Sequence, residues 1–451
     1  MTTPPGFGVF GDLFSTSEMQ ASFSEASWFT RMIEVEAALA RAEASCGVIP
    51  QAAGDAIDKA CARLKIDDAG LKAGTEIVGY PVLPLVRQIA AASGEAGGYV
   101  HWGATTQDIM DTALVLQMRA GFDLLETDLR RLIVSLTSHC TTHRDVVMAG
   151  RTHLQHALPI TFGFKCAGWL APLLRCLERV HQARPRVLQL QFAGAVGTLA
   201  SLGADAQRVR DALGRELGLA VPPIGWHSAR DGIGEAASVI AILTGAVAKI
   251  ATDIVLLMQS EIGEAFEPYA PGRGGSSTMP QKCNPMASEF VLAAARNVQA
   301  QVPVLLAAGA ADHERATGPW HAEWTALPQV FLLGAGAVAR TAEIVEGLEI
   351  DAARMAANLD LTGGLIMAEP VMMALGRELG RQVAHDVVEN ACRAALESGK
   401  SFADCLIAED AIAQHLDREQ IENLLDPATY TGLAGEFTDN VVAAATRALE
   451  E

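Results

Sequence analysis

The sequence predicts an all-α protein built around a bundle of long helices. Of its 451 residues, 50% are hydrophobic and only 5% are aromatic, and alanine is abundant throughout. This composition favours helices that pack closely on one another. Apolar residues recur at helical spacing over five long runs that contain few helix breakers. The runs are approximately 111–143, 160–188, 228–262, 285–310 and 322–348. We find no strand-like alternation of any length, so no sheet is expected.

Shorter helical segments flank the long runs. Residues Ser27–Ser45 have apolar positions at helical spacing, and residues 52–98 contain shorter helices joined by Gly and Pro turns. We therefore expect three helical domains: N-terminal (1–110), central bundle (111–361) and C-terminal (362–451). The apolar faces of the long helices are wide, which indicates burial against other copies of the chain.

The charge balance restricts the possible partners. The formal net charge is -19 at pH 7, which disfavours nucleic acid and anionic membranes as partners. An anionic substrate would need basic residues gathered locally. The most apolar stretch, residues 236–258, contains Lys249 and Asp253, so we expect a buried bundle helix and no membrane span.

The cysteines and the missing cofactor motifs indicate a cytoplasmic protein that needs no cofactor. The chain has eight cysteines but no C-x-x-C pair, which is typical of reduced thiols in the cytoplasm. The first 14 residues lack the pattern of a signal peptide. No zinc-ligand spacing, dinucleotide fingerprint or phosphate loop is found, so we expect no metal and no nucleotide cofactor.

The densest group of reactive side chains lies in residues 272–285, GRGGSSTMPQKCNP. Ser276, Ser277, Lys282 and Asn284 share a glycine-rich segment between two helical runs. Backbone N–H groups and a lysine can hold a carboxylate or an enolate-like dianion. A serine can remove a carbon-bound proton when its neighbours lower its pKa. Such a loop could close over a substrate and exclude water.

A second candidate segment is HWGATTQD, residues 101–108, directly before a long helix. Thr105, Thr106 and Asp108 are suitable N-terminal capping residues. The same hydroxyl and N–H groups could also bind a substrate carboxylate at the helix N-terminus. Both roles can apply at once.

Two further segments carry histidines. In GRTHLQHALPITFG, residues 150–163, His153 and His156 flank Gln155, and an arginine lies close by, which favours a site over a purely structural role. The segment HERATGPWHAEW, residues 313–324, is rich in charged residues and contains two tryptophans. Packing at a helix end and contact with a substrate explain this last segment equally well.

Together these segments resemble the fumarase/aspartase superfamily. GSSTMPQKCNP resembles its signature G-S-S-x-M-P-x-K-x-N-P, HWGATTQD resembles H-x-G-x-T-[ST]-x-D, and GRTHLQ resembles G-R-T-H-x-Q. The three occur in the order of the family and span the chain. The flanking sequences LQFAGAVGTLASLG (190–203) and EAFEPYAPGRGG (264–275) are most similar to the 3-carboxy-cis,cis-muconate cycloisomerase branch.

This resemblance implies a homotetramer with a core of twenty helices and active sites shared by three subunits. It implies a cofactor-free reaction in which a base removes a proton beside a carboxylate, an aci-carboxylate forms and a β leaving group departs. The implied catalytic residues are Ser276 as the base, Lys282, His153 and Glu289. The implied substrate-binding residues are His101, Thr105, Thr106, Gln155, Asn284, Ser277, Met279 and Arg315.

The chain departs from the cycloisomerase pattern at two places. Bacterial cycloisomerases replace the histidine of the T-H pair and lose its glutamate partner, whereas this chain retains both His153 and Glu289. A histidine oriented by a carboxylate can protonate a leaving group, which favours a lyase or an epimerase. Cys283 stands where many relatives have a basic residue, which weighs against a substrate with an extra anionic group there.

The preferred hypothesis is therefore reversible β-elimination, or epimerisation, on a succinyl-type polycarboxylate such as an iminodisuccinate-like N-substituted aspartate. The alternative is 3-carboxy-cis,cis-muconate cycloisomerase. Adenylosuccinate lyase shares the motifs but is less similar in the flanking sequence. A fourth hypothesis, an inactive structural relative like the lens crystallins, conflicts with the retention of Ser276, Lys282 and His153.

Overall fold

The computed structural model describes residues 8–270, 272, 274, 275, 278, 279, 281–315 and 317–450. It confirms the prediction of an all-α fold. All five predicted long runs form helices, and their ends fall within a few residues of the predicted ones. They are α7 (Thr106–Thr142), α8 (Phe162–Val187), α10 (Asp231–Leu257), α11 (Met286–Ala307) and α12 (Pro319–Glu346).

The chain forms two compact units, each assembled from three segments. Unit 1 contains residues 1–129, 176–248 and 290–339, and unit 2 contains residues 130–175, 249–289 and 340–451. The prediction of three domains that follow one another along the sequence is not tested by this division into units, and it stays a prediction.

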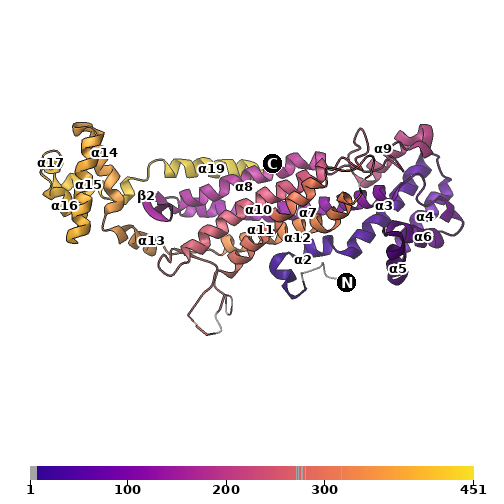
Figure 1. The fold of residues 1–451 in the computed structure, drawn as a ribbon, viewed down its shortest axis with the longest axis horizontal. Coiled ribbons are helices and arrows are strands. Elements are labelled where there is room, and N and C mark those ends of the chain that lie inside the picture. The colour runs from indigo at the N-terminus through magenta and orange to yellow at the C-terminus, as the bar shows by residue number, and fades with distance from the viewer. Residues whose placement is uncertain are drawn as a thin grey trace. The chain divides into compact units, whose positions relative to one another are not determined.

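The shorter helices of unit 1 pack around α3. Helix α3 contacts α4 and α9 (Figure 1), and Gly54 permits the first approach, because a Cβ atom there would lie 2.6 Å from the Ala44 Cβ. Met32, Leu39 and Ile57 are fully or almost fully buried in the core of this unit. Its shorter helices are α1 (Gly11–Phe14), α2 (Ser17–Ser22), α3 (Glu25–Ser45), α4 (Gln51–Arg63), α5 (Asp68–Val78), α6 (Val82–Ala92) and α9 (Ala206–Leu217). Short 3₁₀ helices cover Gly8–Phe10, Gly94–Tyr99 and Ala200–Asp205.

Unit 2 has a separate small core, around Val371, Phe402 and Leu406, where α14, α15 and α16 meet (Figure 1). The first turn of α11 is capped from a distance, since the Glu267 carboxylate accepts from the backbone N–H groups of Ala287 (3.2 Å) and Ser288 (2.7 Å). Its shorter helices are α13 (Ala352–Leu359), α14 (Ala368–Leu379), α15 (Arg381–Ser398), α16 (Phe402–Ala408), α17 (Asp410–Ala413), α18 (Arg418–Leu424) and α19 (Ala434–Glu450). Short 3₁₀ helices cover Asp360–Thr362, Leu365–Met367 and Pro427–Thr429.

The expectation that the chain has no strands is wrong for unit 2. Strands β1 (Val147–Thr152) and β2 (Gln155–Thr161) form an antiparallel hairpin, and β3 (Ala265–Phe266) pairs with β4 (Glu349–Ile350). Buried and exposed residues do not alternate along β1, and the pairing is irregular between Ala149 and Arg151. The pattern of a half-exposed strand is therefore missing from the sequence.

Helices α10 and α11 carry apolar surface that the rest of the chain leaves exposed. By length and composition both could cross a membrane, yet only 44% and 28% of their most apolar windows are buried within the chain. Ile242, Val304 and Leu306 are among the exposed apolar side chains. At the same time α10 carries Lys249 bonded to Asp253, whose carboxylate also accepts from the Trp169 indole N–H at 2.7 Å.

Candidate active site

Residues 101–108 form the entry to α7, as the sequence predicts. The helix begins at Thr106, and the Thr105 N–H donates to the Asp108 carboxylate (3.0 Å) while the Asp108 N–H donates to the Thr105 carbonyl (3.0 Å). The capping role therefore belongs to this reciprocal pair. Thr105 and Thr106 are half-buried. Each retains a hydroxyl at a helix N-terminus, where an anion is favoured.

Asp108 is completely buried and joins three segments of unit 1. Besides Thr105, its carboxylate accepts from the Gln191 amide (3.1 Å), the Ala193 N–H (2.9 Å), the Gly194 N–H (2.9 Å) and the His227 Nε2 (2.7 Å). A buried carboxylate is tolerated when its oxygens are satisfied by such donors. Asp108 thus fixes residues 101–108 to the loop that follows Leu190.

One turn further along α7, Asp111 belongs to a buried ion cluster. Arg230 donates to Asp111 (2.7 and 3.0 Å) and to Glu323 (2.9 and 2.5 Å), and the Trp320 indole N–H donates to Asp111 (3.0 Å). All four side chains are at most 2% exposed. Trp320 and Glu323 of the HERATGPWHAEW segment therefore have a structural role. Arg230 was not singled out from the sequence.

His101 is held by a second buried carboxylate. Its Nδ1 lies 2.6 Å from Glu36 Oε1, and Glu36 on α3 is 1% exposed. Burial lowers the pKa of His101, but the charge of Glu36 and its hydrogen bond raise it more, so the net shift is upward. Because Nδ1 is engaged, Nε2 is the ring nitrogen left for a substrate.

Helix α3 carries a second buried carboxyl group, that of Glu43. Glu43 is completely buried, and neither carboxyl oxygen has a hydrogen-bond partner in the described residues. Burial, together with the charge of Glu36, raises the pKa of Glu43 to about 9. This carboxyl is therefore uncharged near neutral pH.

Arg315 contacts the same loop region as Asp108. Its Nη2 donates to the Ala195 carbonyl (2.8 Å), while its buried Nε has no partner in the described residues. The neighbouring His313 has a positive φ of 44°. Arg315 thus lies against the loop that contains Ala193 and Gly194, and in the protomer it is bonded to backbone.

His153 occupies the tip of the β1–β2 hairpin in unit 2. Thr152 pairs with Gln155, so His153 and Leu154 are the two loop residues, with φ of 51° and 62°. Two positive φ values define the type I′ turn, which normally requires Gly or Asn. His153, Leu154 and Gln155 are all exposed in the protomer. The hairpin therefore presents His153 and Gln155 outward at the cost of backbone strain.

Arg151 anchors this hairpin close to its tip, where it pairs with His156 next to the pair of Thr152 with Gln155. Its guanidinium donates to both oxygens of the fully buried Glu264 (2.8 and 2.6 Å), which also accepts from the Asn358 amide (2.7 Å). The arginine of the G-R-T-H segment is thus a structural anchor. His156 is half-buried, and burial together with Arg151 lowers its pKa.

The glycine-rich segment 272–285, here called the serine loop, is closed at its base by backbone pairing. Gly275 bridges Cys283, and the Gly274 carbonyl accepts from both the N–H (3.0 Å) and the side-chain amide (2.9 Å) of Asn284. A Cβ atom on Gly274 would lie 2.4 Å from the Asn284 carbonyl oxygen, so glycine is required there. In this conformation the predicted carboxylate ligand Asn284 closes the loop.

The remaining predicted loop residues are distributed as follows. Lys282 and Met279 are exposed. Ser276 and Ser277 lie outside the described residues. Glu289, in the first turn of α11, is exposed, and its side chain forms no hydrogen bond or ion pair with His153 within the described part of the protomer.

Backbone strain coincides with the predicted site segments. Among the described residues, positive φ outside glycine occurs at His101, His153, Leu154, Leu199 and His313. His101, His153, Leu154 and His313 lie in the predicted site segments, and Leu199 lies in the flanking sequence 190–203. Such conformations persist where the surroundings enforce them, and they concentrate at functional sites. The sequence gives no direct signal of this strain, because none of these residues is a glycine or an asparagine.

A mainly helical fold whose sequence carries the motifs of residues 101–108, 150–163 and 272–285 is typical of a lyase or isomerase of the fumarate lyase superfamily. The chain belongs to the family described as "Lyase", which matches residues 14–300, and the description "Adenylosuccinate lyase C-terminus" matches residues 364–441. The chain is therefore an enzyme of this superfamily.

Individual relatives cover nearly the whole chain. A 3-carboxy-cis,cis-muconate cycloisomerase from Pseudomonas aeruginosa is 45% identical over 447 residues, 98% of this chain and 97% of the relative. An N-acetyl-S-(2-succino)cysteine lyase from Dickeya dadantii is 38% identical over 97% of this chain and 96% of its own. The crystal structure of a 3-carboxy-cis,cis-muconate lactonizing enzyme from Pseudomonas putida superposes with a TM-score of 0.93, at 43% identity, over 98% of this chain and 99% of that one.

We expect Glu36→Gln to lower the pKa of His101, because it removes the carboxylate that offsets burial. A raised pKa in the folded state contributes stability below the pKa of the unfolded chain, about 6.5. That contribution is lost as pH rises through the folded pKa. Titration of the histidine ring resonances by NMR measures the shift. The matched control is Glu43→Gln, which removes an uncharged carboxyl and should leave His101 nearly unchanged. An unaltered His101 pKa in Glu36→Gln would contradict the pairing.

Proposed function

We propose that the enzyme catalyses reversible β-elimination on a succinyl-type polycarboxylate such as an N-substituted aspartate, or epimerises it through the same intermediate. The observation that carries this proposal is the presentation of His153. The hairpin tip holds it in a strained turn, exposed and unbonded to Glu289 within the protomer. A residue displayed in this way is available to a partner surface. The relatedness to a succinocysteine lyase supports a substrate with a succinyl group.

In the proposed reaction Ser276 accepts the proton from the carbon beside one carboxylate. The C–H electron pair moves into that carboxylate and gives an aci-carboxylate dianion. Lys282, exposed on the serine loop, stabilises this charge. The dianion then collapses to a carbon–carbon double bond, the bond to the β substituent breaks, and His153 donates a proton to the departing nitrogen or oxygen. Addition of the amine or alcohol to the unsaturated acid is the reverse.

Binding of the substrate would use groups from different subunits of the proposed homotetramer. Thr105 and Thr106 at the N-terminus of α7 would take one carboxylate, and His101 would position the substrate through Nε2. In unit 2, Gln155 beside the hairpin tip would take another carboxylate. Ser277, Met279, Asn284 and Arg315 complete the proposed set. Asn284 could bind substrate through its amide oxygen while its N–H groups keep the loop closed.

A second candidate function is that of a 3-carboxy-cis,cis-muconate cycloisomerase. The observation in its favour is the 45% identity to such an enzyme over almost the full length of both chains. Its chemistry uses the same proton transfer and aci-carboxylate in the direction of ring closure. The retention of His153 with Glu289 is what favours elimination over this alternative.

We also propose a homotetramer in which three subunits contribute to each site. The uncovered apolar surface of α10 and α11 supports it, because a second copy would bury the surface that the protomer leaves exposed. His153 has no hydrogen-bond partner among the described residues of the protomer, which supports it as well.

Light scattering of the purified protein should give four times the protomer mass of 47.5 kDa. A monomer of full activity would reject the shared site.

A substrate screen distinguishes the candidate functions. We expect N-substituted aspartates to yield fumarate, seen as an increase in its ultraviolet absorbance. Carboxymuconate should be converted slowly or not at all. Efficient lactonisation of carboxymuconate, without release of fumarate from any aspartate derivative, would instead establish the cycloisomerase.

The proposed general base can be tested with Ser276→Ala. Loss of a general base should reduce kcat by on the order of a hundredfold or more. The tetramer mass and the thermal unfolding temperature should stay as in the wild type. Near-normal kcat in this variant would mean that another group removes the proton.

The pairing of His153 with Glu289 can be tested by a double-mutant cycle. If Glu289 of one protomer orients His153 of another, His153→Ala and Glu289→Gln should each reduce kcat by roughly a hundredfold, and the double variant by little more. Losses that multiply would show independent residues. Unchanged activity of His153→Ala would remove this residue from the mechanism.

A further inference from the structure

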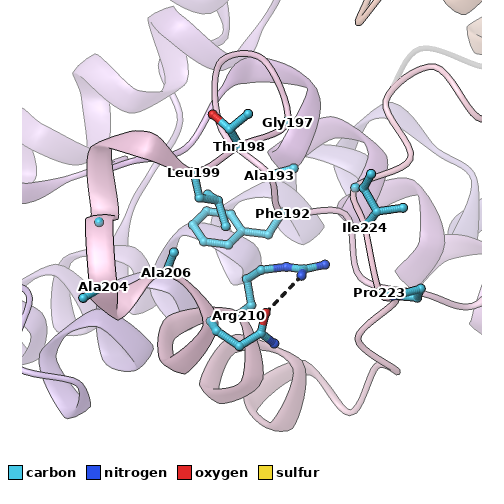
Figure 2. Close-up of a pocket in the computed structure, with 13 residues that line it drawn as sticks. Phe192, Ala193, Gly197, Thr198, Leu199, Ala204, Ala206, Arg210, Pro223 and Ile224 are labelled. Atoms are coloured by element: carbon cyan, nitrogen blue, oxygen red, sulfur yellow. Dashed lines mark hydrogen bonds between the residues drawn. The ribbon is translucent and has the colours of Figure 1, made fainter.

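Unit 1 contains a cavity that none of the predicted catalytic residues lines. Its volume is about 290 Å³, at the small end of the usual range for ligand sites. Two loops and α9 enclose it: Phe192 and Leu199 come from the first loop, Ile224 from the second, and Arg210 from the helix (Figure 2). Its lining therefore combines apolar side chains with polar groups and one cationic side chain.

Arg210 is a buried cation that lacks an anion. It is 7% exposed, and it extends beneath Phe192 toward Pro223 and Ile224 (Figure 2). Its Nη2 donates to the Pro222 carbonyl (2.8 Å) and its Nη1 to the Gln207 amide oxygen (3.4 Å), while Nε has no partner in the described residues. Both acceptors are neutral. No carboxylate of the described chain forms an ion pair with Arg210.

The contrast with Arg230 shows how unusual this is. Arg230, in the same unit, is also buried, but it is bonded to two carboxylates, Asp111 and Glu323. A buried charge is costly unless it is paired, and burial lowers the pKa of Arg210 by more than the charges of Asp211 and Asp108, neither of which bonds to it, raise it. An anion in the cavity would supply the missing partner.

The composition of the cavity defines the chemistry of that anion. A guanidinium binds a planar carboxylate through parallel hydrogen bonds. Phe192, Leu199 and Ile224 offer an apolar surface to the rest of the molecule. The Gln207 amide N–H donates to Asp211 at 2.8 Å, which fixes its oxygen toward Arg210 and leaves the guanidinium as the principal donor.

We propose that this cavity is a binding site for a small organic monocarboxylate with an apolar body, and that Arg210 is its charged anchor. The site is formed within one protomer by residues outside the three signature segments. Its wall continues directly into Ala193 and Gly194, whose N–H groups hold Asp108. An occupant would therefore lie against the loop that fixes the start of α7.

Calorimetric titration with benzoate tests the proposal. We expect one benzoate to bind per protomer, benzyl alcohol not to bind, and Arg210→Leu to weaken binding by at least about tenfold. The matched control is Arg208→Leu, which removes an equal charge from the same helix, where Arg208 pairs with Asp205 on the surface. It should bind like the wild type.

Two further variants separate this site from the catalytic one and from an effect on folding. Lys282→Ala should keep benzoate binding, because Lys282 belongs to the serine loop. Ala206→Leu, which narrows the cavity at the start of α9, should weaken binding even if Arg210→Leu fails to fold. Equal binding by the wild type and both cavity variants would overturn the proposal. So would loss of all binding in Lys282→Ala, since that would assign the benzoate to the catalytic site.

Discussion

The geometry of the start of α7 in unit 1 depends on one buried carboxylate, Asp108. Its two oxygens accept from the helix entry, from the loop after Leu190 and from His227. Three backbone N–H groups that lie away from water are satisfied by this one side chain, so it holds the three segments together. The cluster of Asp111 and Arg230 repeats this solution one turn along the helix. These buried hydrogen bonds and ion pairs fix the backbone that carries the hydroxyls of Thr105 and Thr106.

Unit 2 uses a different means of placing the residues of its proposed site. The hairpin tip has an unfavourable turn, and the ion pair of Arg151 with the fully buried Glu264 anchors the hairpin next to that turn. Strain at the tip can persist because this anchor is strong. Unit 1 therefore fixes its proposed site residues through satisfied hydrogen bonds, and unit 2 through a buried ion pair beside a strained turn.

The sequence predicted the long helices well, because their apolar periodicity is a local property repeated over many residues. It also located the segments that carry the proposed site. It could not predict the pairings between them: Glu36 is 65 residues from His101, and Arg230 is 119 residues from Asp111. The hairpin has no such local signal, because buried and exposed residues do not alternate along β1 and its turn residues, His153 and Leu154, are not turn formers. The anchoring role of Arg151 depends on a glutamate that no local pattern connects to it.

The cap that Glu267 places on α11 has a consequence for how the enzyme family can diversify. It ties the chain before the serine loop to Ser288, directly after it, so the intervening segment has its two ends joined independently of its own conformation. A loop closed in this way can change its length with little loss of stability, because doubling its length would add only about 0.6 kcal/mol of closure entropy. Positions other than Gly274, Ser276 and Lys282 can accept insertions or new side chains while α11 keeps its first turn. Substrate preference can thus evolve in one short segment at little risk to the fold.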